Sequence, residues 1–282
     1  MKIGITGAGG FLGSNLVKKL IEIGEKDLIC LDMFDIPEGP YERKKVNLAE
    51  KEIIDELKGV DIIFHCASIH PWKKYTDTQY FDYNIKGTWN LYKTCFEFGI
   101  KKVILTSSIA VNGYNFPLEK WPVKENMITT PSDLYSLTKQ VQEKIAKHFA
   151  EYKNIQTIAL RPCYFVPKNN ITTGFLLLKH YILIEDLVNA HISALYCKKE
   201  IRKFEPFIIA NKLPYTKKDK NLKGWELPEK YFPGVREFFE KNGFKEFNIS
   251  VVFSINKAKK FLKWEPKYNF DWWWENKKYS NF

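Results

Sequence analysis

The chain has 282 residues, of which 45% are hydrophobic and 16% aromatic, so it can bury a large core. This composition excludes a disulfide-stapled miniprotein, a collagen-like or low-complexity chain and an intrinsically disordered one. The formal net charge is +11, but only four of the 44 basic residues are arginine. Because base-edge and bidentate phosphate recognition favour arginine, the lysine excess predicts a solvated surface and no specific nucleic-acid partner.

Short apolar runs alternate with amphipathic stretches over the first 165 residues, which is the pattern of β-α-β units around a parallel sheet. We expect strands at residues 2–6, 27–32, 61–66, 102–107 and 156–161. Between them we expect helices at residues 10–23, 49–58, 82–98 and 132–152, the second capped by Asn47. Continuous apolar runs are typical of buried parallel strands, so the predicted fold is α/β, a Rossmann-like doubly wound parallel sheet.

The rhythm changes after Pro162, where irregular segments surround one clear helical pattern at residues 185–196. A lysine-rich stretch follows at residues 212–223, and three tryptophans occupy positions 272–274. We therefore expect a Rossmann-like domain at residues 1–165 and a smaller substrate-binding region at 166–282. The helix at 185–196 should pack back on the first domain, and the tryptophans should be buried against the smaller region or a dimer mate.

A glycine-rich segment, TGAGGFLG, ends the first predicted strand and begins the first predicted helix. Gly7, Gly10 and Gly13 stand three residues apart, as a tight turn, close approach to a pyrophosphate and close strand-helix packing require. The helix start offers free N–H groups to an anion. The segment predicts a dinucleotide site that also includes Phe11 and Leu12, the alternative being a packing turn without a ligand.

Asp32 ends the next predicted strand, 19 residues beyond Gly13. A carboxylate there can accept hydrogen bonds from both ribose hydroxyls of an adenosine and would repel a 2′-phosphate. The position therefore favours NAD over NADP. Asp35 is a second candidate for the same role. The alternative interpretation is that Asp32 is a solvated aspartate at the end of a strand and binds no ligand.

Tyr135 and Lys139 stand four residues apart on a predicted helix and so share a face. The pair alone is a weak signal, because tyrosine and lysine are both common in this chain. It gains meaning from Asn84 and Ser108, which precede it in the chain after the glycine-rich segment. Tyrosine next to a lysine ammonium is suited to acid-base work on a hydroxyl group.

Taken together, these segments resemble the successive motifs of the extended short-chain dehydrogenase/reductases, the NAD-dependent epimerase/dehydratase family. The resemblance covers nearly the whole chain. The segments that carry it are GAGGFLG, NIKGT at 84–88, SSIAVNG at 107–113, YSLTK at 135–139, LRP at 160–162, IEDLVNA at 184–190, and KA at 257–258 followed by LKWEP at 262–266.

The resemblance implies Tyr135 as the acid/base, Lys139 as its electrostatic partner and a ribose ligand, and Ser108 as hydrogen-bond donor to the reacting oxygen. Asn84 would hold a water or backbone position beside Lys139. The further cofactor-binding residues are Asn47, Leu48, Cys66, Ala67, Ser68, Asn84, Thr106, Tyr135, Lys139 and Pro162. The family often dimerises through the helix that ends here at Phe96 and Phe98, packed with the Tyr135 helix, so we expect a homodimer.

The reaction that the resemblance implies is hydride transfer from a carbinol carbon of a sugar or nucleotide sugar to NAD. The family's epimerases return the hydride, whereas its dehydrogenases release NADH, and the motifs fit both. Only 22 residues separate Pro162 from Glu185, which resembles the shortened segment of the uronate dehydrogenases. The uronate dehydrogenases bind the carboxylate of the sugar acid with an arginine, and residues 168–178 contain no arginine. Lys179 could replace it only as a point charge. A non-catalytic NAD-sensing or nucleic-acid-binding relative is a further alternative.

Other features favour plain interpretations. The five cysteines have no C-x-x-C spacing, so we expect reduced thiols. His65, Cys66 and His70 lack a second pair at ligand spacing, and we expect no metal there. The sequence opens as a strand and has no apolar stretch long enough to span a bilayer, which predicts a cytoplasmic protein without a membrane partner.

Overall fold

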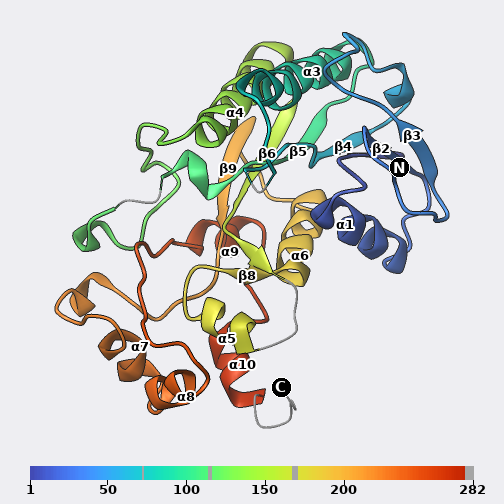
Figure 1. The fold of residues 1–282 in the computed structure, drawn as a ribbon. Helices are drawn as coiled ribbons and strands as arrows, with labels where there is room; N and C mark the ends of the chain where they lie inside the picture. Colours follow the sequence, from blue (N-terminus) through green and yellow to red (C-terminus); the bar gives the residue numbers. More distant parts are fainter. Residues whose placement is uncertain (72, 114–115, 167–170, 277–282) are drawn as a thin grey trace.

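The structure is a computed structural model that describes residues 1–71, 73–113, 116–166 and 171–276. Its centre is a seven-stranded sheet in the order β3-β2-β1-β4-β5-β6-β9, and every neighbouring pair is parallel (Figure 1). The predicted Rossmann-like α/β fold is therefore confirmed. The strands are β1 (Ile3–Thr6), β2 (Leu28–Asp32), β3 (Glu42–Lys45), β4 (Ile62–His65), β5 (Lys102–Thr106), β6 (Gln156–Pro162) and β9 (Phe204–Ile209).

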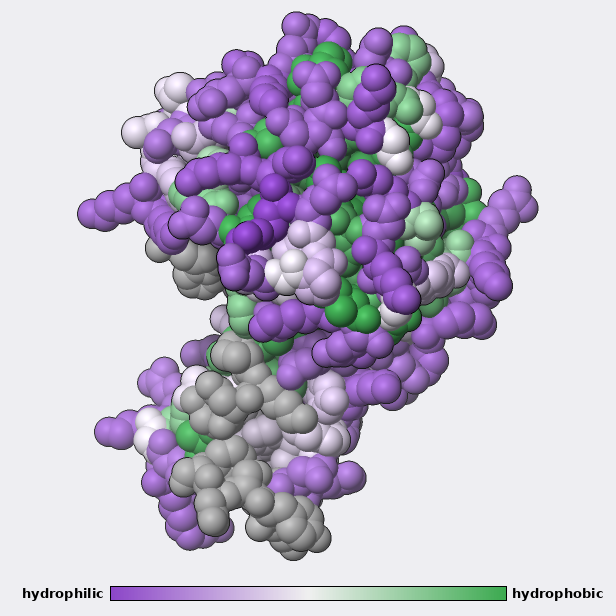
Figure 2. All heavy atoms as spheres, turned by 90° about the vertical axis from the view of Figure 1, so that its right-hand side faces the viewer, coloured by the Kyte–Doolittle hydropathy of each residue, from purple (hydrophilic) through white to green (hydrophobic). Residues whose placement is uncertain are grey.

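Helices cover both faces of this sheet. The helices α1 (Phe11–Glu22) and α6 (Ile184–Leu195) lie on one face, and α3 (Gly87–Glu97) and α4 (Leu134–Lys153) lie on the other (Figure 1). Hydrophilic side chains cover most of the face of this body that is turned to the viewer in Figure 2. Among the described residues, none of the helices has both the length and the hydrophobicity needed to cross a bilayer.

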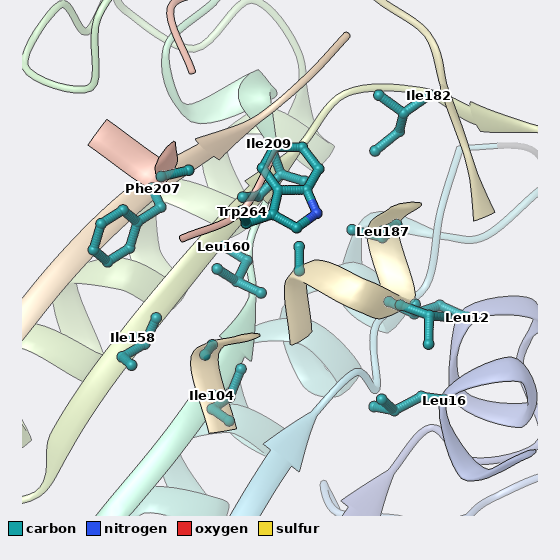
Figure 3. Packing of buried hydrophobic residues seen from close by; sticks show 14 of the residues in the cluster. Leu12, Leu16, Ile104, Ile158, Leu160, Ile182, Leu187, Phe207, Ile209 and Trp264 are labelled. Carbon is teal, nitrogen blue, oxygen red and sulfur yellow. The ribbon is translucent and has the colours of Figure 1, made fainter. Parts of the chain in front are cut away.

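The strands divide their side chains between two cores because successive residues of a strand point to opposite faces. Leu28 and Cys30 of β2 belong to the core under α1 and α6, whereas Ile29 and Leu31 belong to the core under α3 and α4. The first core also includes Trp264. Figure 3 shows this core with Leu12 and Leu16 of α1, Ile104, Ile158 and Leu160 of the sheet, and Leu187 of α6.

A smaller lobe lies beyond the ends of the central strands (Figure 1). It contains α5 (Ile171–Leu177), α7 (Glu226–Tyr231), α8 (Val235–Lys241) and α10 (Phe270–Asn276), with α9 (Asn256–Phe261) against β9 and the short pair β7 (Phe165–Val166) and β8 (Ile182–Leu183). Its core is aromatic: the rings of Phe239 and Trp273 stack 5.7 Å apart. A Cβ on Gly174 would lie only 2.3 Å from the Trp273 ring, so α5 and α10 are in close contact. The tryptophan segment thus packs within the smaller lobe, as expected.

One local prediction was wrong, two strands were not predicted, and one predicted helix differs in its details. The helix expected at residues 49–58 is only a 3-10 turn at Asp55–Leu57, because Asn47 Oδ1 accepts from Ala49 N and Ile54 N donates to Thr94 Oγ1 of α3. The edge strands β3 and β9 were not predicted: β3 is hydrophilic and wholly exposed, and β9 contains a proline. The helix expected at 82–98 is α3 preceded by α2 (Asp77–Tyr80) and a π-helical segment at Phe81–Lys86.

Candidate active site

The glycine turn between β1 and α1 has the close contacts that its spacing predicted. Gly7 has φ +72°, and a Cβ there would lie 2.6 Å from Ala67 N. A Cβ on Gly13 would lie 2.1 Å from Gly7 O, so only glycine permits this approach of turn and helix. No side chain caps the first turn of α1 at Gly10. Its N–H groups are therefore available to an anionic group, which fits a dinucleotide pyrophosphate.

Asp32 joins the end of β2 to the same turn. Its Oδ2 accepts a hydrogen bond from Gly9 N at 2.9 Å, and its Oδ1 accepts from Phe34 N at 3.0 Å. Each carboxylate oxygen retains a second acceptor position, so a ribose hydroxyl can still bind there. Asp35 instead points into solvent, where its carboxylate contacts Lys45 Nζ at 3.3 Å. The structure thus favours Asp32 over Asp35.

The first cavity lies along the ends of β1, β2 and β4 and measures about 470 Å³. It is also lined by Phe34, Tyr75 and Tyr83, which no motif indicated. Aromatic walls flanking an aspartate and a glycine turn are suited to the adenosine half of a dinucleotide. Nine of the predicted cofactor-binding residues line it: Gly7, Gly10, Phe11, Asp32, Asn47, Leu48, Cys66, Ala67 and Ser68.

The second cavity measures about 740 Å³ and lies between the carboxyl ends of β4, β5 and β6 and the beginning of α4. The two cavities adjoin, because they share the lining residues Gly7, Gly10, Phe11, Cys66, Ser68 and His70. This is where parallel α/β sheets bind ligands. The predicted residues that the structure adds here are Leu12, Gly13, Thr106, Ser108, Tyr135, Lys139 and Pro162.

Tyr135 lies in the first turn of α4, behind the N-cap Asp133, whose Oδ1 accepts from Ser136 N at 2.8 Å. Burial raises the pKa of Tyr135 above its usual value, a hydrogen bond with Ser108 acts in the opposite direction, and the Asp133 charge adds to the rise. Ser108 begins a turn after β5, and its Oγ accepts from Ala110 N at 3.1 Å. The predicted pair of Ser108 and Tyr135 is therefore assembled in one wall of the second cavity.

Lys139 lies one turn further along α4, with Nζ 5.7 Å from the centroid of the Tyr135 ring. Nζ donates to the carbonyl oxygen of Thr106 at 3.0 Å. Burial lowers the pKa of Lys139 to about 7, and the nearby Cys66 and Glu143 oppose this shift. The imidazole of His70 packs 4.9 Å from the Tyr135 ring on the cavity side. Burial, with the Lys139 charge, lowers the pKa of His70 to about 4, so His70 is neutral near pH 7.

Asn84 is not brought into either cavity; it is fully buried in the π-helical segment. Its Oδ1 accepts from Ile69 N at 2.8 Å, and its Nδ2 donates to Ile69 O and to Thr138 Oγ1. Thr138 Oγ1 in turn donates to the carbonyl oxygen of Tyr135 at 2.8 Å. Asn84 therefore holds the loop that follows β4 against α4, and its expected role beside Lys139 stays a prediction.

A buried ion pair fixes the Ser108 turn from behind. Arg161 donates from Nε and Nη2 to the two carboxylate oxygens of Glu143 at 2.8 and 2.6 Å. Ser107 Oγ also donates to Glu143, and Arg161 Nη1 donates to Asn112 Oδ1 at 3.0 Å. Asn112 and the carbonyl oxygen of Glu125, which accepts from Nη1 at 2.8 Å, thus complete the hydrogen bonding of the buried guanidinium.

The histidines have no metal-binding arrangement. His65 bonds to Thr6 Oγ1 and Thr88 Oγ1, and His191 bonds to Thr106 Oγ1 and Leu187 O. Within the described parts of the chain, no three His, Cys, Asp or Glu side chains are grouped to hold a metal ion.

Lys179 does not line either cavity. Its Nζ lies 4.6 Å from the ring centroid of Phe175, inside the smaller lobe. The prediction that it could serve as the positive charge of the substrate site therefore finds no support in its position. Residues 168–170, in the shortened segment, lie outside the described residues.

Comparison with known proteins agrees with this geometry. Residues 4–181 match the model of the 3-beta hydroxysteroid dehydrogenase/isomerase family. A sterol-4-alpha-carboxylate 3-dehydrogenase, decarboxylating, from Bos taurus is 32% identical over 166 residues, 56% of this chain and 45% of the relative, so the match spans about half of that protein. A UDP-glucose 4-epimerase from Lactobacillus helveticus is 24% identical over 95% of this chain and 93% of the relative.

Among solved structures, the UDP-glucuronic acid 4-epimerase from Bacillus cereus in complex with NAD superposes with a TM-score of 0.73. The two chains are 21% identical, and the match covers 98% of this chain and 99% of that one, which shows a shared fold. The predicted relationship to the extended short-chain dehydrogenase/reductases is confirmed. The chain belongs to the 3-beta hydroxysteroid dehydrogenase/isomerase family.

Proposed function

We propose that this protein is an NAD-dependent oxidoreductase of the epimerase/dehydratase type that acts on a carbinol carbon of a sugar-type substrate. The observation that carries the proposal is that the cavity at the glycine turn and Asp32 adjoins the cavity lined by Ser108, Tyr135 and Lys139. NAD supplies, when bound, a hydride acceptor for the substrate carbon. Its adenosine half would be held by the first cavity and its nicotinamide half by Cys66, Thr106 and Pro162.

The chain's own residues would move the proton. Tyr135 removes the hydroxyl proton of the substrate while Ser108 donates a hydrogen bond to the same oxygen. The charged Lys139 favours the phenolate form of Tyr135, which burial alone opposes. Asn84 acts through the backbone and keeps the loop after β4 beside α4.

The sugar class of substrate is supported by the UDP-glucose 4-epimerase relative, which is matched over 93% of its length, whereas the sterol dehydrogenase is matched over 45%. Re-reduction of the oxidised substrate on its other face would make the enzyme an epimerase, and release of the oxidised product would make it a dehydrogenase. Both start with the same proton and hydride removal. We also infer a cytoplasmic homodimer without a specific nucleic-acid partner.

Tyr135→Phe tests the assignment, with Tyr152→Phe as a control on the exposed end of the same helix. Turnover of a panel of sugars and UDP-sugars is followed by NADH absorbance and by epimer analysis, and NAD binding by calorimetry. We expect Tyr135→Phe to lose at least about 100-fold in rate with NAD affinity retained, because an acid/base contributes that much. Near-normal turnover by Tyr135→Phe would refute the role of this residue.

A further inference from the structure

The second cavity has aromatic walls on two sides. Tyr164 and Tyr181 stack with their ring centroids 5.1 Å apart and an interplanar angle of 23°. On another wall, the rings of His70 and Tyr135 pack 4.9 Å apart. All four rings line the cavity. Flat aromatic surfaces of this kind bind the C–H face of a ring that carries hydroxyl groups at its edge.

Two carboxylates and one buried ammonium lie in the described wall of this cavity. Asp77, in the first turn of α2, and Asp133, the N-cap of α4, both line it, and both are exposed. The only cation among the described lining residues is Lys139, whose ammonium donates to Thr106 O at 3.0 Å. Two other described lysines are engaged elsewhere: Lys73 lies over the Phe34 ring in the first cavity, and Lys179 lies over the Phe175 ring.

The negative charge of Asp133 acts on Tyr135, the residue that would bind the reacting hydroxyl of the substrate. Its charge raises the pKa of Tyr135 and also that of Tyr80, another residue of the cavity wall. A substrate oxygen bound to Tyr135 therefore lies within the same field. An anionic substituent would be repelled by both carboxylates, whereas a neutral hydroxyl can donate a hydrogen bond to either of them.

We propose that the second cavity selects a neutral polyhydroxylated ring, such as a free sugar or a simple glycoside, and disfavours substrates that carry a phosphate, a carboxylate or a nucleotide diphosphate. This inference rests on the oxidoreductase function proposed above and narrows its substrate class. Repulsion of anionic substrates contributes to this selection as much as attraction of neutral ones does.

The test is a series of substrates matched in ring stereochemistry: each neutral aldose, its 6-phosphate, its uronate and its UDP conjugate, assayed with NAD by NADH formation and by epimer analysis. We expect kcat/KM for the preferred neutral sugar to exceed that of each anionic form by about tenfold or more, because an anionic substituent would enter a cavity lined by two carboxylates. A tenfold preference for any anionic form would overturn the inference. Loss of turnover across the whole series in a protein that binds NAD would instead contradict the proposed function.

The variants Asp77→Asn and Asp133→Asn test whether the two carboxylates cause the preference for neutral sugars. Asparagine is an equally good N-cap, so Asp133→Asn removes the charge and keeps the start of α4. We expect the double variant to narrow the preference for the neutral sugar by roughly fivefold to tenfold. Asp55→Asn, an exposed aspartate remote from both cavities, is the matched control and should leave the preference unchanged. An unaltered preference in the double variant would show that the two carboxylates do not set it.

Discussion

The buried ammonium of Lys139 makes the stability of this protein depend on pH. Burial lowers its pKa to about 7 from the usual 10.5. Between these values the unfolded chain binds more protons than the folded one, so the free energy of unfolding rises with pH. Below pH 7 the folded state bears the full cost of the buried charge.

Lys139→Met removes this contribution while keeping a side chain of similar shape. We expect the variant to be more stable than the wild type at pH 6 to 7, with the difference shrinking by up to about 1.4 kcal/mol per pH unit toward pH 10. Urea unfolding of both proteins across pH 6 to 10 measures it. A difference that is constant with pH would show that Lys139 is protonated throughout this range.

Prediction from sequence succeeded where a residue type is required by its backbone or by its spacing. Gly7 and Gly13 were identifiable because no Cβ fits at either position, and Tyr135 and Lys139 because their helical spacing follows Asn84 and Ser108 in the chain. Tyr164 and Tyr181 escaped prediction because their place in the wall depends on the pairing of β7 with β8. In a chain with 16% aromatic residues, no local signal distinguishes such rings from core residues.

Helices and strands with a regular hydrophobic pattern were predicted well. Segments whose structure depends on contacts with distant parts of the chain were not. β3 has four exposed polar residues and exists only because it pairs with β2. Residues 49–58 have helical composition, but Ile54 N bonds to Thr94 of α3 and the segment buries Leu57 instead of continuing as a helix. Tertiary contacts override intrinsic propensity in both cases.

The helix α6 links the sheet to the C-terminal segment through Asp186. This buried carboxylate accepts from Lys267 N at 2.9 Å and from Tyr268 N at 3.0 Å, while its carbonyl accepts from Trp264 Nε1. Asp186→Asn replaces one acceptor with an amide donor, so one backbone N–H is left without a partner. We expect a loss of roughly 1–3 kcal/mol of stability.

The effect should be local. Hydrogen exchange should accelerate in residues 264–276 and remain unchanged in α1, because the lost bonds belong to the C-terminal segment alone. Glu185→Gln, at the neighbouring position of α6, is the matched control. Equal acceleration in both variants would show that Asp186 does not anchor this segment.

At the scale of the whole molecule, the two parts of the structure do not coincide with two consecutive stretches of the sequence. β9 follows residue 165, yet it pairs with β6 in the main sheet, and α6 packs on α1 as expected. The smaller lobe therefore draws on the residues before β9 and after it, and its aromatic core joins α5 to α10. The division into a Rossmann-like domain at residues 1–165 and a smaller region at 166–282 remains a prediction, and β9 of the second part belongs to the sheet of the first.

The predicted homodimer can be tested on the outer face of α3. Trp89 and Phe96 are 45% and 47% exposed, stand seven residues apart and so share one helix face, and Trp89 packs on Phe149 of α4 with ring centroids 5.3 Å apart. Large exposed aromatics that share one helix face are typical of a subunit interface.

Sedimentation velocity of the wild type should give a dimer at micromolar concentration, and Trp89→Glu should give a monomer, because burying a carboxylate against a second copy is costly. Ile128→Glu, an exposed apolar residue 53% accessible in a loop away from α3, should leave the dimer intact. Trp89 lines neither cavity, so NAD affinity should be the same in the Trp89→Glu variant as in the wild type. A wild type that sediments as a monomer at all concentrations would mean that these aromatics are simply exposed, and that the dimer expected from the family resemblance does not form in this chain.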